Sequence, residues 1–495
     1  MTKSKTSLPQ ALAFATWLFC VPFLGADGTP APIPTATPDV LPEGVKIERV
    51  EFGRLDPAVA KSSRTQVSRD FTAIAFSEKA EGGERIVFQG TPGPVYPSIY
   101  SFRFAPAGRR WSYEAKVDTG KCALVVDGAP GPVFETADDL TWSTDGRHYV
   151  YRVRRAEDSA WAVVLDGQVG EFQPGRIATL AISPHGAHHA FVREDQNGNA
   201  ILAFSDGHRI AETSTGFSYS PFFWCENGAT FAYVAKQGNE QVLVVDGTER
   251  GRGSNIDPDY VVLARDGGHF AAILALADGK YAVLHDDKRY GPYKMVWAKP
   301  ELSADGARVA FVATLDDDLA HVIVDGTPGP AAINRWGARN VQFTADGRTV
   351  AYLLQIGDNK YAIHAGDRVV GEGQNISRFW LSPDGARIVW AAKPSGGYRI
   401  VLDGNESEPV FGDLDQDSAG FSPDGKTFHY LATRDRKSFT VRVAGVGGRT
   451  YELAAPRFLF PSPEAMVFVT YENGVFFRET WTLPQEPVGN RPPSS

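Results

Sequence analysis

The sequence is poor in cysteine, the residue that could tie a fold together covalently. It has 3 cysteines among 495 residues, and beyond the N-terminal segment only Cys122 and Cys225 remain. These two occupy different positions in the repeat described below and could form at most one disulfide bond. A disulfide scaffold is therefore excluded, and stability must come from apolar burial.

Familiar catalytic signatures are also missing. The sequence contains no Gly-x-Ser-x-Gly elbow, no His-Glu-x-x-His metal motif and no phosphate-binding glycine loop. These absences exclude the enzyme classes that depend on such local motifs. They do not exclude an active site assembled from residues that lie far apart in the chain.

Clustered charge is the third absence. The formal net charge is −9, and no run of like charge is longer than three residues. Nucleic-acid-binding proteins carry basic patches, so an acidic and evenly mixed surface argues against nucleic acid as the partner.

The two ends of the chain differ from the rest. Lys3 and Lys5 precede an apolar run at residues 8–24, and the small residues after it predict a signal peptide over 1–26. The run is short for a membrane span and contains Pro22, so we expect no membrane span after cleavage, although a retained anchor stays open. Residues 27–45 are rich in Pro, Thr and Ala and predict a linker, and residues 484–495 predict a disordered tail.

A repeated unit fills most of the chain between these two ends, and its clearest copy is at residues 380–404. Each copy has a first turn that contains a glycine, and in most copies a second turn, Asp-Gly, follows about twenty residues later. Asp-Gly between two apolar runs predicts a tight hairpin, because type I′ turns need positive φ at both central residues. The glycines of the first turn recur at spacings of 38 to 42 residues, which defines a repeat array, and they are Gly108, Gly146, Gly186, Gly228, Gly267, Gly306, Gly347, Gly385 and Gly425.

The strand that follows the first turn is apolar on both faces. Its fifth residue after the turn glycine is aromatic in eight of the nine copies. The opposite face carries small and aliphatic residues, such as Ala310 and Val312. A sheet with one wet face would alternate apolar with polar residues. We therefore expect sheets that are covered on both sides, as when small sheets stack around an axis.

Each unit of about forty residues has room for four strands, for example at 341–344, 350–354, 361–364 and 368–371. The intact Ser-Pro-Asp-Gly turns at 382–385 and 422–425, each followed by an apolar strand with an aromatic residue, resemble the repeat of the TolB-type, WD-like β-propeller family. The resemblance covers roughly residues 68–483 and implies a fold, not an activity. We predict an all-β protein over 46–483, a β-propeller of about ten four-stranded blades, built as one wide ring or two tandem propellers.

The last unit, near residues 458–480, lacks an outer strand. The expected strand at 46–52 could supply it, because a closed ring removes exposed sheet edges. We therefore predict that the first strand of the chain completes the last blade.

Two clusters could hold a metal ion. His185, His188 and His189 lie close together, but neighbouring residues of a strand point to opposite faces, so we expect His188 to be a rim residue and the cluster to bind no metal. The alternating carboxylates of Asp413, Asp415 and Asp417 could hold calcium, although a full calcium loop would need a glycine and a later acidic ligand.

The loops that join blades carry large aromatic and charged residues. In a propeller these loops emerge opposite the Asp-Gly turns, and aromatic residues with arginine dominate recognition surfaces. Several of these residues, such as Trp224 and Trp380, could instead cap blades or begin the next strand. The candidates for ligand binding are Tyr219, Asp257, Asp259, Tyr260, Trp297, Lys299, Arg335, Trp336, Arg339, Arg378 and Phe379.

We therefore expect an exported, non-catalytic scaffold, periplasmic or extracellular, that binds a protein, peptide or glycan partner on its loop-rich face and needs no cofactor. The alternative is a propeller hydrolase or lyase whose acid and base residues converge in a central pocket. Carboxylates, or a histidine with a carboxylate, within hydrogen-bond reach in such a pocket would favour the enzyme.

Overall fold

The computed structural model describes residues 45–60, 64–194, 200–204, 209–213, 217–393, 397–406, 412–433, 438–444, 447–455 and 457–483. The expected signal peptide, the linker up to residue 44 and the C-terminal tail lie outside these residues. Within the described ranges, no helix combines the length and the hydropathy that a membrane crossing requires.

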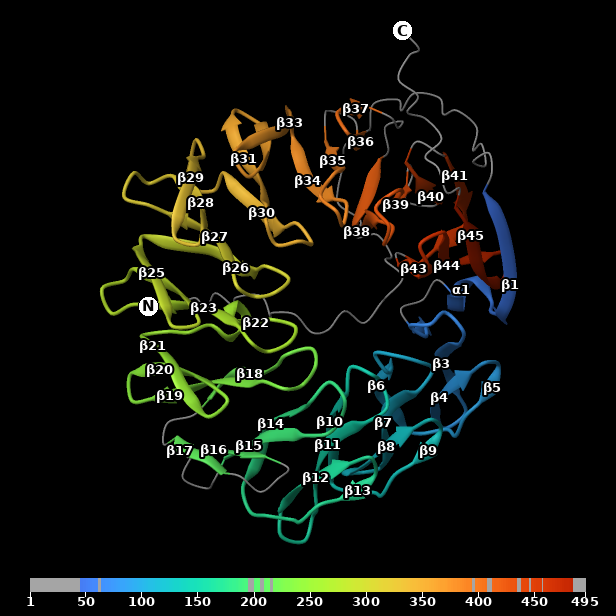
Figure 1. The fold of residues 1–495 in the computed structure, drawn as a ribbon. Helices are drawn as coiled ribbons and strands as arrows, with labels where there is room; N and C mark the ends of the chain where they lie inside the picture. Colours follow the sequence, from blue (N-terminus) through green and yellow to red (C-terminus); the bar gives the residue numbers. More distant parts are fainter. Residues whose placement is uncertain are drawn as a thin grey trace, which may run out of the picture.

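Eleven small antiparallel sheets follow one another around a single ring (Figure 1). The predicted all-β propeller is confirmed, and of the two arrangements left open the protein adopts the single wide ring. In the blades made of four consecutive strands, the first strand lies nearest the centre and the fourth strand at the outer rim, whereas in the last blade the N-terminal strand of the chain lies at the outer rim (Figure 1). We number the blades 1 to 11 along the chain, so that blade 1 begins with β2.

The strands of blades 1 to 4 are β2 (Thr65–Val67), β3 (Ile74–Ala80), β4 (Gly83–Phe88), β5 (Thr91–Pro92), β6 (Ser98–Phe104), β7 (Trp111–Asp118), β8 (Lys121–Val126), β9 (Ala129–Pro130), β10 (Thr136–Trp142), β11 (Tyr149–Arg154), β12 (Trp161–Leu165), β13 (Gln168–Val169), β14 (Arg176–Ile182), β15 (His189–Glu194), β16 (Ala200–Phe204) and β17 (Arg209–Thr213). Those of blades 5 to 7 are β18 (Phe217–Trp224), β19 (Phe231–Gln237), β20 (Glu240–Val245), β21 (Thr248–Gly253), β22 (Val262–Leu263), β23 (Phe270–Ala275), β24 (Tyr281–His285), β25 (Lys288–Tyr293), β26 (Met295–Leu302), β27 (Val309–Thr314), β28 (Ala320–Val324) and β29 (Thr327–Ala331).

Blades 8 to 10 contain β30 (Ala338–Phe343), β31 (Val350–Gly357), β32 (Lys360–Ala365), β33 (Arg368–Gln374), β34 (Ile376–Leu381), β35 (Ile388–Ala392), β36 (Arg399–Leu402), β37 (Asn405–Glu406), β38 (Asp413–Phe421), β39 (Phe428–Thr433), β40 (Phe439–Val443) and β41 (Gly447–Tyr451). Blade 11 contains β1 (Lys46–Arg54), β42 (Leu453–Ala454), β43 (Leu459–Ser462), β44 (Ala465–Glu472) and β45 (Val475–Thr482). The two helical turns are α1 (Pro57–Ala60) and η1 (Pro258–Tyr260).

Blade 1 carries a first turn that has no glycine. Phe71 takes the glycine position with a φ of 57° and is only 3% exposed. The rest of the turn is unchanged, because the Ser68 hydroxyl donates to Asp70 at 2.6 Å. The buried aromatic ring compensates for the left-handed backbone. A count of turn glycines therefore falls short of the eleven blades.

The other turns have the predicted conformations. All nine first-turn glycines have φ between 68° and 80°. In the second turn of each blade, wherever it is a described Asp-Gly pair, both residues have positive φ, for example 49° at Asp403 and 84° at Gly404. The serine of the first turn is bonded on both sides, because the Ser382 hydroxyl donates to Asp384 at 2.6 Å and accepts the amide of Arg387 at 2.9 Å.

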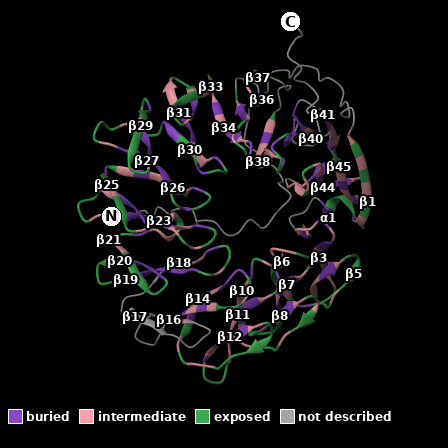
Figure 2. Ribbon diagram, in the orientation of Figure 1, coloured by how far each residue is buried: buried purple, intermediate pink, exposed green. Residues whose placement is uncertain are grey.

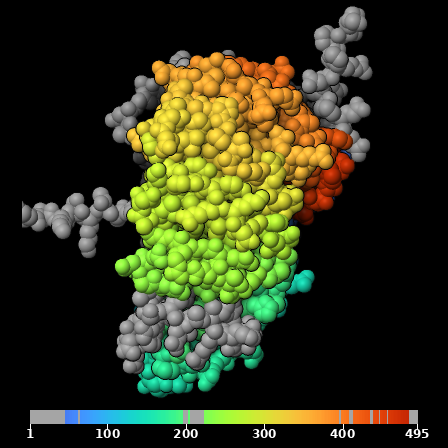
Figure 3. Space-filling view, turned by 60° about the vertical axis from the view of Figure 1, so that its left-hand side comes forward, coloured from blue at the N-terminus to red at the C-terminus, as the bar shows by residue number. Residues whose placement is uncertain are grey.

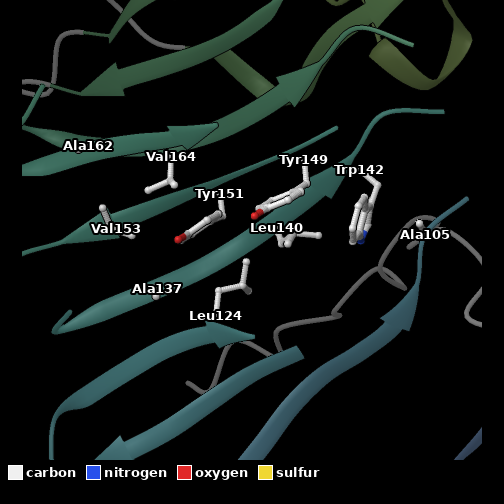
Figure 4. Close-up of a cluster of buried hydrophobic side chains, with 10 residues drawn as sticks. All are labelled: Ala105, Leu124, Ala137, Leu140, Trp142, Tyr149, Tyr151, Val153, Ala162 and Val164. Carbon is white, nitrogen blue, oxygen red and sulfur yellow. The ribbon is translucent and has the colours of Figure 1, made fainter. Parts of the chain in front are cut away.

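Apolar side chains fill the spaces between neighbouring sheets. Tyr149 and Tyr151 of β11 lie in one row with Trp142, and the two tyrosine rings are stacked with centroids 6.3 Å apart (Figure 4). Buried residues occupy the middle of the blades, and exposed residues collect toward the outer strands (Figure 2). The blades from green to orange pack as adjacent bands (Figure 3). Burying both faces of each sheet is what holds the ring together.

Blade 11 closes the ring as predicted. β1 pairs antiparallel with β45, from Lys46 opposite Thr482 to Arg54 opposite Val475. The carboxylate of Glu479 is fully buried beside this seam and lies 2.8 Å from Nε of Arg49. It also accepts hydrogen bonds from the hydroxyl of Tyr451 and from the indole N–H of Trp481. A buried carboxylate needs such partners, so Arg49 and Glu479 couple the two ends of the fold.

Candidate functional site

The ring has two different faces. The turns between the first and second strands and those between the third and fourth strands of each blade lie on one face, which we call the turn face. The loops between the second and third strands and the loops that join successive blades lie on the other, which we call the loop face.

On the turn face, one contact recurs from blade to blade. Nε of Arg387 donates to the turn carboxylate of Asp403 at 3.0 Å, and its Nη1 donates to the carbonyl of Lys426 in the next blade. Arg308 does the same with Asp325 at 2.8 Å and with the carbonyl of Arg348 at 2.7 Å. Each arginine thus ties its own hairpin to the following blade. The polar groups of this face are occupied by the fold.

Histidine replaces arginine in this contact in blade 6. Among the described residues, ligand atoms of three metal-binding side chains gather within 4.8 Å at one place, formed by His269, His285 and Asp286. However, Nε2 of His285 donates to the carbonyl of Gly306 at 2.9 Å, and Nδ1 of His269 lies 2.7 Å from Asp286. The first contact joins blade 6 to blade 7 and the second lies within blade 6, so both groups already serve the fold and we assign them to structure.

The histidines at 185–189 do not converge either. Nδ1 of His185 lies 3.8 Å from the turn carboxylate of Asp145 in the preceding blade. His188 is exposed at the start of its strand, where other blades carry the arginine described above. His189 faces the space between blades, and burial lowers its pKa.

The carboxylates predicted for calcium serve other partners. Asp417 pairs with Arg378 at 2.9 Å, and Asp415 accepts the backbone amides of residues 417 and 418 at 3.0 Å each. Burial raises the pKa of Asp415. Among the described residues, the ligand atoms of Asp413, Asp415 and Asp417 do not gather at one place as a metal site would require, and Arg378 is occupied by Asp417.

Four of the predicted binding residues come together on the loop face. Trp297 and Lys299 of β26 and Trp336 and Arg339 at the start of β30 line a groove of about 370 Å³ between blades 7 and 8. We call it the Trp groove. Glu301 and Asn340 complete its polar lining. Trp297, Lys299 and Glu301 all come from β26.

The aromatic part of the groove is a pair of indoles. The rings of Trp297 and Trp336 have centroids 4.2 Å apart at an interplanar angle of 47°. The indole N–H of Trp297 donates to the Thr314 hydroxyl at 2.8 Å, which fixes this ring against its blade. Trp336 remains 64% exposed. One tryptophan supports the other, and the second offers its free surface to solvent.

The loop that carries Trp336 is held from both blades. The side-chain oxygen of Asn334 accepts the amide of Trp336 at 2.8 Å, and its Nδ2 donates to Gln355 at 3.1 Å. The Asn334 carbonyl accepts the amide of Ala320 in blade 7 at 3.2 Å. A Cβ atom at Gly337 would lie 2.6 Å from that of Ala332, so the loop needs glycine there. The exposed indole is thus presented by a fixed backbone.

Both strands that flank the groove are irregular. β26 has a bulge between Trp297 and Glu301, and β30 has one between Arg339 and Gln342. Within these bulges Ala298 has a φ of 60° and Asn340 a φ of 56°. Similar bulges occur in the first strands of other blades, for example between Asp138 and Thr141 with a φ of 59° at Asp139, so they belong to the repeat. They turn side chains out of the ordinary alternation.

Charged groups of both signs line the groove. The Glu301 carboxyl meets solvent on one side and the groove wall on the other, and this partial desolvation raises its pKa, while nearby Lys299 opposes the shift. Arg339 donates through Nη2 to the carbonyl of Ile376 at 3.0 Å, and its guanidinium lies 4.7 Å from the ring centroid of Tyr361. Arg339 is therefore both part of the groove and a link to blade 9.

The other predicted binding residues do not line this groove. Phe379 is 1% exposed and packs in the core, which corrects its prediction as a binding residue. Asp257 caps η1 by accepting the amide of Asp259 at 3.0 Å, and Tyr260 packs against a core cluster. Arg335 is exposed beside Trp336, and the side chain of Tyr219 lies outside the described residues. Trp224 and Trp380 pack in the cores, as the alternative interpretation proposed.

Sequence reasoning missed Glu301, Asn340 and Asn334. Glu301 lies only two residues beyond Lys299, but the bulge between Trp297 and Glu301 makes ordinary strand alternation an unsafe guide to it. Asn340 and Asn334 gave no signal, because their roles depend on a bulge and on contacts with Gln355.

A second group of ionisable residues lies at the inner strands of blades 2 and 3. Arg152 pairs with Asp138 at 2.7 Å and lies 3.7 Å from Asp139. Its Nη1 also donates to the carbonyl of Ile177 at 2.7 Å in blade 4. Burial raises the pKa of Asp139, and burial together with the charge of Asp138 raises that of Glu114. Two carboxyl groups with raised pKa values thus belong to this group, Asp139 beside Arg152 and Glu114 near the charge of Asp138.

Comparisons with known proteins add little. No family model matches the chain, and no curated protein matches it. Solved structures do match, in 734 chains. One, described as "Crystal structure of the eukaryotic initiation factor", aligns over 84% of this chain and 99% of its own at 11% identity with a TM-score of 0.40. A likeness at this level carries no argument about function.

Proposed function

We propose that this protein is a non-catalytic binding scaffold whose Trp groove binds a peptide or glycan. The observation that supports this most directly is Trp336, which is 64% exposed although its loop is fixed by Asn334 and Gln355. Large aromatic side chains are normally buried, and an exposed one that is held in place indicates a recognition surface. The loop face contributes the ligand-binding residues, and the turn face contributes stability.

A preformed groove favours binding in a simple way. A ligand that stacks on Trp336 does not have to order the loop, because the loop is already ordered by its own hydrogen bonds. Trp297 supports the indole from behind at a centroid distance of 4.2 Å. Aromatic anchors of this kind often contribute about 2 kcal/mol or more to binding.

Two parts of this proposal depend on the sequence alone. Export to the periplasm or the extracellular space is supported by the positively charged and apolar pattern of residues 1–26. Membership in the TolB-type, WD-like repeat family is supported by the Ser-Pro-Asp-Gly turns at 382–385 and 422–425.

Arrays of defined glycans and defined peptides test the binding function. Trp336→Ala should lower the affinity of the groove for each of its ligands by at least about thirtyfold. Tyr100→Ala is the matched control, because Tyr100 is also exposed, at 53%, but lies on β6. Loss of binding in Trp336→Ala with retention in Tyr100→Ala supports the proposal. Equal binding by wild type and Trp336→Ala, for all ligands on both arrays, would refute it.

A hydrolase or lyase is the second candidate, and it depends on Glu114 and Asp139. A raised carboxyl pKa beside a second carboxylate is a common arrangement for acid and base catalysis. The simpler role for the group is structural, because Arg152 already joins blades 3 and 4. Glu114→Gln and Asp139→Asn should each abolish turnover of a polysaccharide or peptide substrate if an enzyme is present. Activity that survives both changes would exclude this group.

A further inference from the structure

Positive side chains outnumber negative ones at the Trp groove. Lys299 and Arg339 line it with one carboxylate, Glu301, and Arg335 is exposed on the adjacent loop. In the described part of the chain, none of these three cations forms an ion pair with a carboxylate. The groove therefore has positive charge that the protein itself does not neutralise.

The groove differs in this respect from many arginine sites of the ring. Arginines elsewhere are commonly matched, as Arg387 is with Asp403 at 3.0 Å and Arg378 with Asp417 at 2.9 Å. The whole chain carries a formal net charge of −9. A local concentration of free positive charge on an acidic protein is a sign of complementarity to an anionic ligand.

The flanking strands argue against a peptide that adds as an extra β-strand. Such a peptide needs a regular strand edge, with backbone groups at even spacing. The innermost edges of β26 and β30 are broken by their bulges, and Ala298 and Asn340 have positive φ within them. The groove offers the exposed indole surface of Trp336 and polar side chains, and these are enough to bind a sugar.

We infer that the ligand of the Trp groove is a glycan that carries anionic groups, either uronate carboxylates or sulfates; this inference rests on the binding function proposed above. The pyranose face stacks on Trp336, and Lys299 and Arg339 bind the anionic group. Asn340 and Glu301 bind hydroxyl groups. Glu301 also limits affinity, because its carboxylate repels the anion.

Isothermal titration with four probes tests the inference. The probes are a tetrasaccharide of galacturonate, a sulfated chondroitin tetrasaccharide, neutral cellotetraose and a tetra-aspartate peptide. We expect at least one anionic glycan to bind about tenfold or more tighter than cellotetraose and the peptide. The uronate and sulfate probes show which anionic group is preferred.

Two charge variants sharpen the test. Lys299→Met should lower the affinity for the anionic glycan by about fivefold and change the affinity for cellotetraose by less than about twofold. Glu301→Gln should raise the affinity for the anionic glycan by about twofold to threefold, because it removes a repulsive charge. Lys288→Met is the control, since Lys288 is exposed on the outer strand β25 and should have no effect.

The outcomes separate this inference from the proposed function. Equal affinity for anionic and neutral glycans, with binding still lost in Trp336→Ala, would overturn the anionic preference and leave the binding function intact. Tighter binding of the peptide than of any glycan would also overturn it. Binding of any of the probes that is unaffected by Trp336→Ala would overturn both.

Discussion

On the turn face the same contacts recur around the ring, whereas on the loop face the joining loops differ from blade to blade. Arg308 and Arg387 make matching bonds to a turn carboxylate and to the next blade. On the loop face, η1 is a capped helical turn, and the Trp336 loop is fixed by Asn334 and Gly337. Repeated contacts serve the structure that all blades share. A feature that occurs once is a better indication of function.

The largest loss of stability is expected at the seam between β1 and β45 that closes the ring. Arg49→Met removes the charged partner of the fully buried Glu479 and should lower the free energy of unfolding by about 3 kcal/mol. Urea-induced unfolding measures the change. Arg54→Met is the control on the same strand, because the Arg54 side chain is 72% exposed and, within the described ranges, its one ion pair is with Glu51. Similar losses in the two variants would contradict the role of Arg49.

The second-largest loss of stability is expected from a change on the turn face. Gly306 has a φ of 73°, and a Cβ atom there would lie 2.7 Å from Cβ of His269 and 2.8 Å from that of Ala264. Gly306→Ala combines backbone strain with a clash and should destabilise the fold by about 2 to 3 kcal/mol. Gly404→Ala meets no atom within 4 Å and should cost about 1 kcal/mol. Melting curves of the two variants test this, and equal costs would show that the clash is relieved.

As the pH falls, protonation linked to buried histidine should lower the stability of the fold before protonation of the turn-face carboxylates does. Hydrogen bonds hold the pKa of turn carboxylates such as Asp305 and Asp346 below the usual range, so their contribution is lost only as pH falls below about 4. His429 is buried beside Phe458 and Phe460, and burial lowers its pKa to about 3. The unfolded chain takes up a proton at this residue below about pH 6.5, and the folded protein does not.

His429 should therefore make the protein less stable by about 2 kcal/mol at pH 5 than at pH 8. Burial also lowers the pKa of His364, which adds to the effect in the same direction. His429→Gln removes this titration and should reduce the difference between pH 8 and pH 5 by about that amount. Urea-induced unfolding at the two pH values measures it. An unchanged difference would show that His429 titrates normally.

The smallest change in stability is expected on the loop face. Trp336→Ala removes a side chain that is 64% exposed and should alter the free energy of unfolding by less than about 0.5 kcal/mol. Thermal melting of the purified variant tests this, in parallel with the binding arrays. A loss as large as that of Gly306→Ala would mean that Trp336 is a packing residue. The two faces would then not differ in the way we describe.

Much of the fold could be predicted because the repeat is a local pattern. The turn glycines, the Asp-Gly hairpins and the aromatic strand positions each follow from a few neighbouring residues. The first blade was harder to count, because Phe71 adopts a conformation that glycine takes elsewhere. The choice of one ring over two depends on how blades far apart in sequence meet, which no local pattern specifies.

The candidate site could be predicted only in part. Large residues in the joining loops indicated Trp297, Lys299, Trp336 and Arg339, and the structure brings these four together. The same reasoning also selected Phe379, because an aromatic residue at the start of a strand looks the same whether it faces solvent or the core. The ion pair between Arg378 and Asp417 joins residues from neighbouring blades, and spacing could not reveal it.

The seam between β1 and β45 also sets the order in which the molecule can be completed. Arg49 and Glu472 are bonded at 2.7 Å across 423 positions of sequence, so an N-terminal strand made early on the ribosome has no partner until synthesis is nearly finished. The entropy lost in joining such distant segments grows only with the logarithm of their separation, so the wide ring closes at little more cost than a narrower one would. A chain that stops before β45 would leave both a lone strand and an open sheet edge, which are sites for self-association.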